Sequence, residues 1–189
     1  MKPKDSSAPG NLETVRRFVN SVDLENPQER EQLASAAAAS AWLHEQHLLP
    51  DYDKLDEEEW EVVLALREAF RMELLSHTGE GDGDAAWENL SVFADRAELG
   101  VRLREPGEVD LIAEGRGIQL VAGRLFAIVY DAIRTGQWAR LKACRKESCL
   151  FGFYDRSKNG SGAWCDMAVC GNRVKAQRRR RRQSVVTSL

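Results

Sequence analysis

Apolar side chains recur every three or four positions through most of the first 138 residues, and this spacing predicts amphipathic helices. Five stripes predict helices that begin near Asn11, Gln28, Asp56, Trp87 and Val121. The third stripe is the longest, and Asp56 with Glu59 has the spacing of a capping box, in which each side chain accepts a hydrogen bond from a free backbone N–H. The pattern predicts a mainly α fold.

Prolines and glycines predict where these helices begin and end. Asn11 is a candidate N-cap of the first helix, because its side chain can accept a hydrogen bond from a free N–H. Pro27 should stop the first helix and Pro50 the second, since proline cannot continue the hydrogen-bond ladder. Gly100 and Gly136 are candidate C′ residues of the last two helices.

A short β-hairpin is predicted between the last two helices. Residues 101–104 alternate between apolar and charged side chains, and residues 109–112 form a second apolar run. Pro106 and Gly107 separate the two runs and are typical of a turn. The expected fold is therefore a helical N-terminal domain with a short hairpin.

Charge divides the chain into two unlike parts. The 189 residues carry a net charge of −3, with 27 basic and 30 acidic side chains. Residues 139–189 hold 13 basic and three acidic residues, whereas residues 1–138 hold 14 basic and 27 acidic ones. The C-terminal segment thus suits a polyanionic partner, which the acidic segment would repel.

Several function classes find no support in the sequence. No apolar run approaches the roughly 18–20 residues that span a membrane, and the first ten residues lack the apolar stretch of a secretory signal. We therefore expect a cytoplasmic protein without membrane contact. No phosphate-binding glycine motif, nucleophile elbow or catalytic triad is present, so we do not expect an enzyme.

Two polar groups in the helical part have modest interpretations. His44 and His47 are three residues apart, which predicts an ordinary exposed helix face rather than a second metal site. The acidic run from Asp51 to Glu59 is expected to be a solvated helix start. The same run could instead contact the basic segment of its own chain, which would mask that segment by charge.

The four cysteines form two pairs with the same four-residue gap, Cys144 with Cys149 and Cys165 with Cys170. A reducing compartment disfavours disulfides, and the matched spacing disfavours four unrelated thiols, although spacing alone leaves both alternatives open. The favoured interpretation is one zinc ion bound by four thiolates. Such a site has no open position for a catalytic water and is therefore structural. It would also supply folding energy to a segment with little core of its own.

Residues around the second cysteine pair carry a family resemblance. Trp164 precedes Cys165, the run Cys170-Gly171-Asn172-Arg173 follows, and residues 153–159 read F-x-D-x-S-x-N. Together with the basic tail, these motifs resemble the CGNR zinc finger over about residues 140–183. The resemblance implies one structural zinc ion, with Cys144, Cys149, Cys165 and Cys170 as its ligands.

In the CGNR family the finger follows a helical domain called ABATE, and three weaker landmarks here resemble it: 18–21, 41–43 and 66–71. The family is bacterial and described as stress-induced transcription regulators. The predicted division of the chain is a flexible tail at 1–10, a helical ABATE-like domain at 11–138, a zinc finger with a basic helix at 139–183 and a tail at 184–189.

The segment after Cys170 favours a helix, and Gly171 would allow a sharp exit from the metal site. A cationic helix fits the major groove, where Asn and Arg side chains can reach base edges while other arginines contact phosphates. We expect nucleic-acid contacts, with double-stranded DNA as the favoured partner, from Asn172, Arg173, Lys175, Arg178, Arg179, Arg180, Arg181 and Arg182.

The leading hypothesis is a transcription regulator whose helical domain forms a homodimer or senses a signal such as a small-molecule effector. One alternative is an RNA-binding or ribosome-associated stress protein, and another is a protein-interaction adaptor with a purely structural finger. Asn172 and Arg173 could also bond to the backbone around the metal. The aromatic residues of the finger should form a small core, and Asp155 should pair with an arginine.

Overall fold

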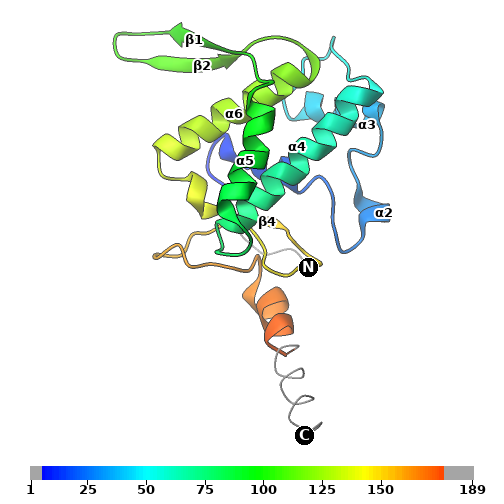
Figure 1. The fold of residues 1–189 in the computed structure, drawn as a ribbon, viewed down its shortest axis with the longest axis vertical. Helices are drawn as coiled ribbons and strands as arrows, with labels where there is room; N and C mark the ends of the chain where they lie inside the picture. The colour runs from blue at the N-terminus through cyan, green and yellow to red at the C-terminus, as the bar shows by residue number, and fades with distance from the viewer. Residues whose placement is uncertain (1–5, 177–189) are drawn as a thin grey trace, which may run out of the picture.

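The computed structural model describes residues 6–176, and residues 1–5 and 177–189 lie outside the described part. The predicted tail at 184–189 falls outside it entirely. A body of helices carries the cysteine-containing segment at one end, and the last described helical turns project away from this body (Figure 1). The predicted mainly α fold, with a short hairpin and a C-terminal cysteine cluster, is confirmed.

The longest helix, α4 (Glu57–Ser76), crosses the centre of the body. The predicted capping box at its start is confirmed, because Asp56 and Glu59 exchange hydrogen bonds with each other's backbone N–H. Phe70, on its buried face, lies 6.2 Å from the ring of Phe18 and 6.3 Å from that of Trp138. Aromatic packing of this kind ties the helix to chain segments far apart in sequence.

The N-terminal part of the body differs from the prediction. Helix α1 (Leu12–Val19) forms as expected, but the side chain of Asn11 makes no capping hydrogen bond. The single helix predicted from Gln28 to Leu49 is wrong, since the chain forms a short α2 (Pro27–Arg30) and a separate α3 (Ala36–Glu45).

The break between α2 and α3 has a local and a tertiary cause. Ser35 caps α3 by accepting a hydrogen bond from the N–H of Ala38, which favours a helix start at this point. Glu31 is extended, and its carboxylate accepts two hydrogen bonds from Arg67 of α4, at 2.7 and 2.9 Å. Pro27 occupies the first position of α2, where proline is common, instead of ending the first helix as predicted.

The predicted hairpin is confirmed as β1 (Leu99–Leu103) and β2 (Val109–Ala113). Helix α5 (Gly83–Ala94) ends before it, so the prediction that Gly100 closes this helix is wrong. Gly107, in the turn between the strands, has a φ of +92°, a conformation that side chains other than glycine rarely adopt. The hairpin leads into α6 (Gly117–Arg134), and Gly136 follows it with φ +68° as predicted.

A second hairpin follows the 3₁₀ turn η1 (Trp138–Arg140). It pairs β3 (Leu141–Ala143) with β4 (Gly152–Tyr154). Leu141 and Ala143 are fully buried in the same apolar cluster as the helices, so this strand forms one wall of the main core. The strands have three residues each, which is too short for a recognisable alternation in the sequence. Among the described residues, no helix is long and apolar enough to cross a membrane.

Candidate metal centre and nucleic-acid interface

The sulfur atoms of the four cysteines meet in one cluster. All four Sγ atoms lie within 4.8 Å of one another, and Cys149–Cys165 and Cys165–Cys170 are each separated by 3.7 Å. A disulfide needs about 2.05 Å, so the sulfurs are not bonded in pairs. Four sulfurs at about 2.3 Å from one zinc ion stand about 3.8 Å apart in a tetrahedron. The cluster therefore fits one zinc ion, and the predicted cofactor is confirmed.

The first cysteine pair sits in the loop of the second hairpin. Cys144 directly follows β3, and its N–H donates to the carbonyl of Phe151 just before β4. The chain then turns, with the N–H groups of Cys149 and Leu150 both donating to the carbonyl of Lys146. Leu150 has a φ of +44°, which places it in the left-handed region. The hairpin thus brings two sulfurs to one side of a tight turn.

The second cysteine pair is held by the π-helical turn η2 (Met167–Gly171). Asp166 caps this turn by accepting the N–H of Val169 at 3.0 Å, and its own carbonyl accepts the N–H of Cys170. Gly171 does not have a positive φ, so its predicted role in a sharp exit is wrong. A Cβ at Gly171 would lie 2.5 Å from the sulfur of Met167, so a larger residue here would displace that exposed side chain.

A buried ion pair holds the loop between the two cysteine pairs. Lys142 donates to a carboxylate oxygen of Asp155 at 2.9 Å, and both residues are under 5% exposed. Lys142 also donates to the carbonyls of Gly160 and Gly162. Asp155 accepts the N–H of Ser157 and that of Gly162. The carboxylate of Asp155 pairs with Lys142 rather than with the expected arginine, although Arg140 donates to the backbone carbonyl of Asp155 at 3.0 Å. The sequence analysis missed Lys142, because a lysine is not expected in a buried strand.

The thiol cluster needs a cation to ionise fully. The neighbouring Cys144 and Cys149 sulfurs raise the pKa of Cys165, and burial raises the pKa of Cys170. The pKa of Cys149 is raised to about 12, chiefly by its hydrogen bond to Cys144. Hydrogen bonds from Cys149 and Cys165 lower the pKa of Cys144, so one thiolate is accommodated at the expense of the others. A divalent ion reverses this balance, because zinc binds all four sulfurs as thiolates.

The helical body holds the finger through polar side chains that the sequence analysis did not identify as functional. Asn20 donates to the carbonyl of Gly152 at 2.9 Å and accepts its N–H at 2.7 Å. Arg71, only 1% exposed, donates to the carbonyls of Val19 and Leu150. Asn20 and Arg71 lie in the segments 18–21 and 66–71, which resemble landmarks of the family. Both residues attach the finger to the helical body.

The described part of the N-terminal tail is also held in place. Ala8 is buried, and its N–H donates to Glu13 at 2.8 Å. The carbonyl of Ser6 accepts the N–H of Tyr154 in β4. Part of the segment predicted as a flexible tail therefore contacts the body and β4.

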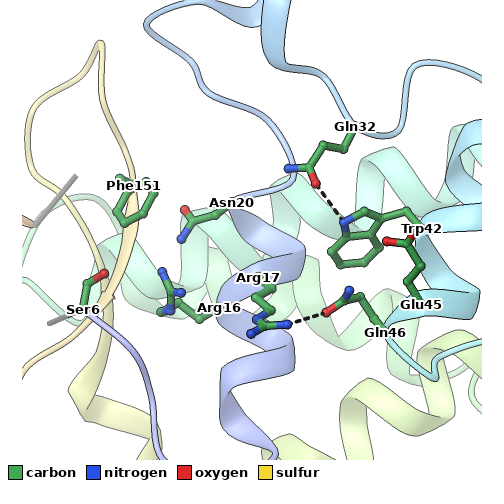
Figure 2. A pocket seen from close by; sticks show the side chains of 9 residues that line it. All are labelled: Ser6, Arg16, Arg17, Asn20, Gln32, Trp42, Glu45, Gln46 and Phe151. Atoms are coloured by element: carbon green, nitrogen blue, oxygen red, sulfur yellow. Dashed lines mark hydrogen bonds between the residues drawn. The ribbon is translucent and has the colours of Figure 1, made fainter. Parts of the chain in front are cut away.

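A polar pocket of about 390 Å³ opens where the helical body meets the finger (Figure 2). Arg16, Arg17 and Asn20 come from α1 and the residue that follows it, whereas Phe151 comes from the finger. Trp42 of α3 forms part of the lining and donates its indole N–H to Gln32. The remaining lining residues are Ser6, Gln32, Glu45 and Gln46.

The basic helix begins on the last zinc ligand. Residues 172–176 are helical and continue directly from Cys170 and Gly171. Asn172, Arg173 and Lys175 are exposed, and the helix leads away from the acidic body (Figure 1). Among the described residues, the backbone N–H of Asn172 donates to the carbonyls of Met167 and Val169, but no side-chain hydrogen bond joins Asn172 or Arg173 to the backbone around the cysteines. The other predicted nucleic-acid contacts lie outside the described residues: Arg178, Arg179, Arg180, Arg181 and Arg182.

Within residues 6–176, the acidic run forms no ion pair with the finger. Within it, Asp53 accepts the N–H of Gly117 at 2.9 Å and Glu59 accepts that of Ile118 at 3.1 Å, so both carboxylates cap α6. Negative charge is favourable at this end of a helix. In residues 6–176, the acids of the helical body that pair with finger cations are Glu25, with Lys146 and Arg173, and Glu80, with Arg145. The charge contact between the two parts is therefore made by other residues than predicted.

The aromatic residues of the finger face the protein rather than solvent. Phe153 is 5% exposed, and Tyr154 packs against the main core. Phe151 lies 5.8 Å from the guanidinium of Arg16. These contacts agree with the predicted packing role. The aromatic residues pack against the main core, however, and not only against each other. His44 likewise bonds to a backbone carbonyl, that of Asp53, and among the described residues the four cysteines are the only group suited to a metal ion.

Fold and site together define a helical protein with a C-terminal four-cysteine zinc finger. The family model described as "Putative stress-induced transcription regulator", ABATE, matches residues 13–135, and the CGNR zinc finger model matches residues 140–183. The chain therefore belongs to the ABATE family and carries a CGNR zinc finger, which confirms the resemblance found in the sequence. A search of the curated proteins finds no match.

Proposed function

We propose that this protein regulates transcription by binding double-stranded DNA through the helix that follows Cys170. The observation that carries the proposal is the position of this helix. It starts on a zinc ligand, exposes Arg173 and Lys175, and projects away from the acidic body (Figure 1). In the sequence, Arg178–Arg182 follow this helix closely and add five more cations to the segment after Cys170.

The zinc centre gives this helix a rigid base. Cys170 is both a ligand and part of the helical turn η2, so metal binding sets the direction in which the helix leaves the finger. A braced cationic helix can enter the major groove, where Asn172 and Arg173 reach bases and the later arginines contact phosphates. We keep residues 139 and 183 as the proposed first and last residues of the finger with its basic helix.

The helical body would receive the signal or join two copies. The pocket between α1, α3 and the finger (Figure 2) is the place where a small effector would touch both parts at once. It lies beside Asn20, which holds the finger backbone at Gly152. An occupant of this pocket would thus alter the contacts that orient the finger.

Binding of the zinc-loaded full chain to a duplex DNA, and to a structured RNA of equal length, tests the proposal over a salt series. Arg173→Ala combined with Lys175→Ala should weaken DNA binding, because it removes a base contact of Arg173 and a phosphate contact of Lys175, and should reduce the salt slope by about one. Arg96→Ala removes an exposed cation from the segment after α5. It is the matched control and should leave both quantities unchanged.

Other outcomes would favour the alternatives. Tighter binding to the RNA at every salt concentration would replace DNA with RNA as the partner. Replacement of Arg178–Arg182 by alanine without loss of regulation in cells would reduce the finger to a structural part of an adaptor. Equal binding to any polyanion with a purely electrostatic slope would contradict specific regulation.

A further inference from the structure

One face of the first hairpin is apolar and exposed. The register pairs Leu99 with Ala113, Val101 with Leu111 and Leu103 with Val109, so alternate residues of both strands place only apolar side chains on this face. Val101 and Leu103 are 66% and 76% exposed. In Figure 1 the strands extend beyond the helices rather than across them.

Only the base of the hairpin is supported by the body. Ala113, at the end of β2, packs closely against Gly123 of α6, whereas Val109, beside the turn, is 51% exposed. A two-stranded hairpin is marginally stable in water unless another strand or a helix covers it. The exposed end of this hairpin therefore lacks the packing that would normally stabilise it.

The outer edge of β1 offers a regular set of backbone groups. Arg104 donates to Glu108, and Glu114 donates to Glu98, so the even-numbered residues of β1 form the hydrogen-bonded pairs with β2. In an antiparallel ladder the intervening residues direct their N–H and C=O groups to the other side. Leu99, Val101 and Leu103 therefore present theirs outward, and the described residues contain no strand on that side.

We propose that β1 pairs with β1 of a second copy of this chain, antiparallel and centred on Val101. This register places Val101 opposite itself and Leu99 opposite Leu103 of the partner, which pairs all the outward backbone groups of the strand. It keeps the apolar side chains of both copies on one face, as the pleat requires. The result is a two-fold symmetric sheet of four strands.

The charges along β1 favour this register over its neighbours. Centring on Val101 places Arg104 opposite Glu98 of the second copy, and Glu98 opposite Arg104, at both ends of the interface. Glu98 is exposed and has no ion pair among the described residues, whereas Arg104 pairs with Asp110 of its own hairpin and would bridge Asp110 and Glu98 of the second copy. Arg102 then lies opposite Gly100, which the side-chain carboxylate of Glu114 covers, so the guanidinium meets an acid there. A shift that centres on Arg102 would instead place two arginines opposite each other, which is unfavourable.

A second copy of this chain fits the edge of β1, because the strand is complementary to itself and forms two reciprocal charge pairs. The inference goes beyond the proposed DNA contact and does not depend on it, because the hairpin and the basic helix lie at different ends of the protein (Figure 1). Loss of dimerisation with intact DNA binding by a single copy, or the reverse, would separate the two proposals.

The first test measures the mass of the zinc-loaded full chain by sedimentation over a concentration series. The wild type should show a reversible monomer–dimer equilibrium. Val101→Lys should raise its dissociation constant on the order of tenfold or more. Leu103→Lys provides a second variant at an even more exposed position, so that a folding defect in one variant does not decide the result.

Val92→Lys is the matched control, since Val92 is a 56% exposed valine on α5 outside the hairpin. It should dimerise like the wild type. A wild type that stays monomeric at the highest concentration would overturn the proposal. So would hairpin variants that dimerise as well as Val92→Lys.

A charge exchange tests the register itself. Glu98→Arg and Arg104→Glu should each weaken self-association, because like charges then face each other across the two-fold axis. A mixture of the two variants should form heterodimers, since every pair across the interface becomes attractive again. Absence of heterodimers in the mixture would exclude the register centred on Val101.

Discussion

At the scale of single residues, buried polar groups organise the finger as much as the metal ligands do. Lys142 and Asp155 each satisfy several partners from the loop between the cysteine pairs. A buried charge without its partner is costly, so the pair selects one loop conformation. That conformation delivers Cys165 to the first cysteine pair, which links an ion pair to zinc binding.

Asp155→Asn should destabilise the zinc-loaded protein by about 3–5 kcal/mol, because it leaves the ammonium group of Lys142 buried without a counter-charge. Denaturant unfolding at neutral pH measures this. Asp95→Asn, at an exposed carboxylate after α5, is the control and should change stability by less than about 0.5 kcal/mol. Similar losses in both variants would contradict the role of the pair.

Acid should weaken the same loop. Burial opposes ionisation of Asp155, but hydrogen bonds from Lys142 and Ser157 outweigh it and hold the pKa well below the ordinary value of 3.8. A lowered pKa in the folded state contributes stability above the unfolded pKa and loses it as the pH falls further. The wild type should therefore lose stability below about pH 4, and Asp155→Asn should lose less over that window.

Cys165→Ser should abolish binding of the one zinc equivalent, because three thiolates and a hydroxyl bind zinc far less well than four thiolates. Metal analysis after dialysis measures the loss. Ser148→Ala alters an exposed residue between the first two ligands and should retain the full equivalent. Retention of zinc by Cys165→Ser would show that the cluster is not the metal site.

At the scale of elements, the finger is anchored by its neighbours as well as by its own hydrogen bonds. Strand β3 lies in the main core through Leu141 and Ala143, and β4 is bonded to the residue that ends α1. The imidazole of His77, just after α4, also contacts the carbonyl of Leu141 at 2.7 Å. The orientation of the finger therefore depends on α1 and α4.

Asn20→Ala should loosen this attachment, because it removes both hydrogen bonds to Gly152 and leaves its backbone groups unpaired. The expected cost is about 1–3 kcal/mol. Hydrogen exchange should become faster around residues 144–154 while zinc content stays at one equivalent. Asn89→Ala, on the exposed face of α5, should leave exchange in that segment unchanged. Unaltered exchange in Asn20→Ala would show that the core contacts of β3 suffice.

At the scale of the whole molecule, an acidic body and a basic end coexist with limited contact. Glu25 pairs with Lys146 and lies 3.9 Å from Arg173, whose side chain stays 61% exposed. A carboxylate at this position competes with a phosphate for the same cations. Within the described residues, this contact restrains the basic helix weakly, at its base, and leaves Asn172 and Lys175 exposed.

Glu25→Gln should raise affinity for a duplex DNA on the order of twofold, which is the scale of an exposed ion pair. The gain should shrink as salt increases, since screening weakens the competing contact as well. Glu29→Gln, an exposed acid on α2, removes the same charge farther from the finger and should have a smaller effect. Equal gains would indicate a general charge effect rather than local competition.

Sequence reasoning succeeded where a feature depends on neighbouring residues. The capping box at Asp56, the glycine turn at Gly107 and the paired spacing of the cysteines are all local, and each is confirmed. Predictions failed where a distant partner decides the outcome. Glu31 is drawn away from a continuous helix by Arg67, and Lys142 is buried because Asp155 lies across the loop.

By itself, the sequence determined most of the helices, the first hairpin and the family, because short-range spacing and motifs encode them. The spacing of the cysteines favoured a zinc site, and the family match and the sulfur cluster decided it. Only the tertiary structure decided how the parts meet: which polar side chains are buried between body and finger, which acids face the cations, and which strand edge stays open. These depend on residues that are far apart in the chain, and burial changes the energy of a charge or a backbone group according to partners that no local pattern reveals.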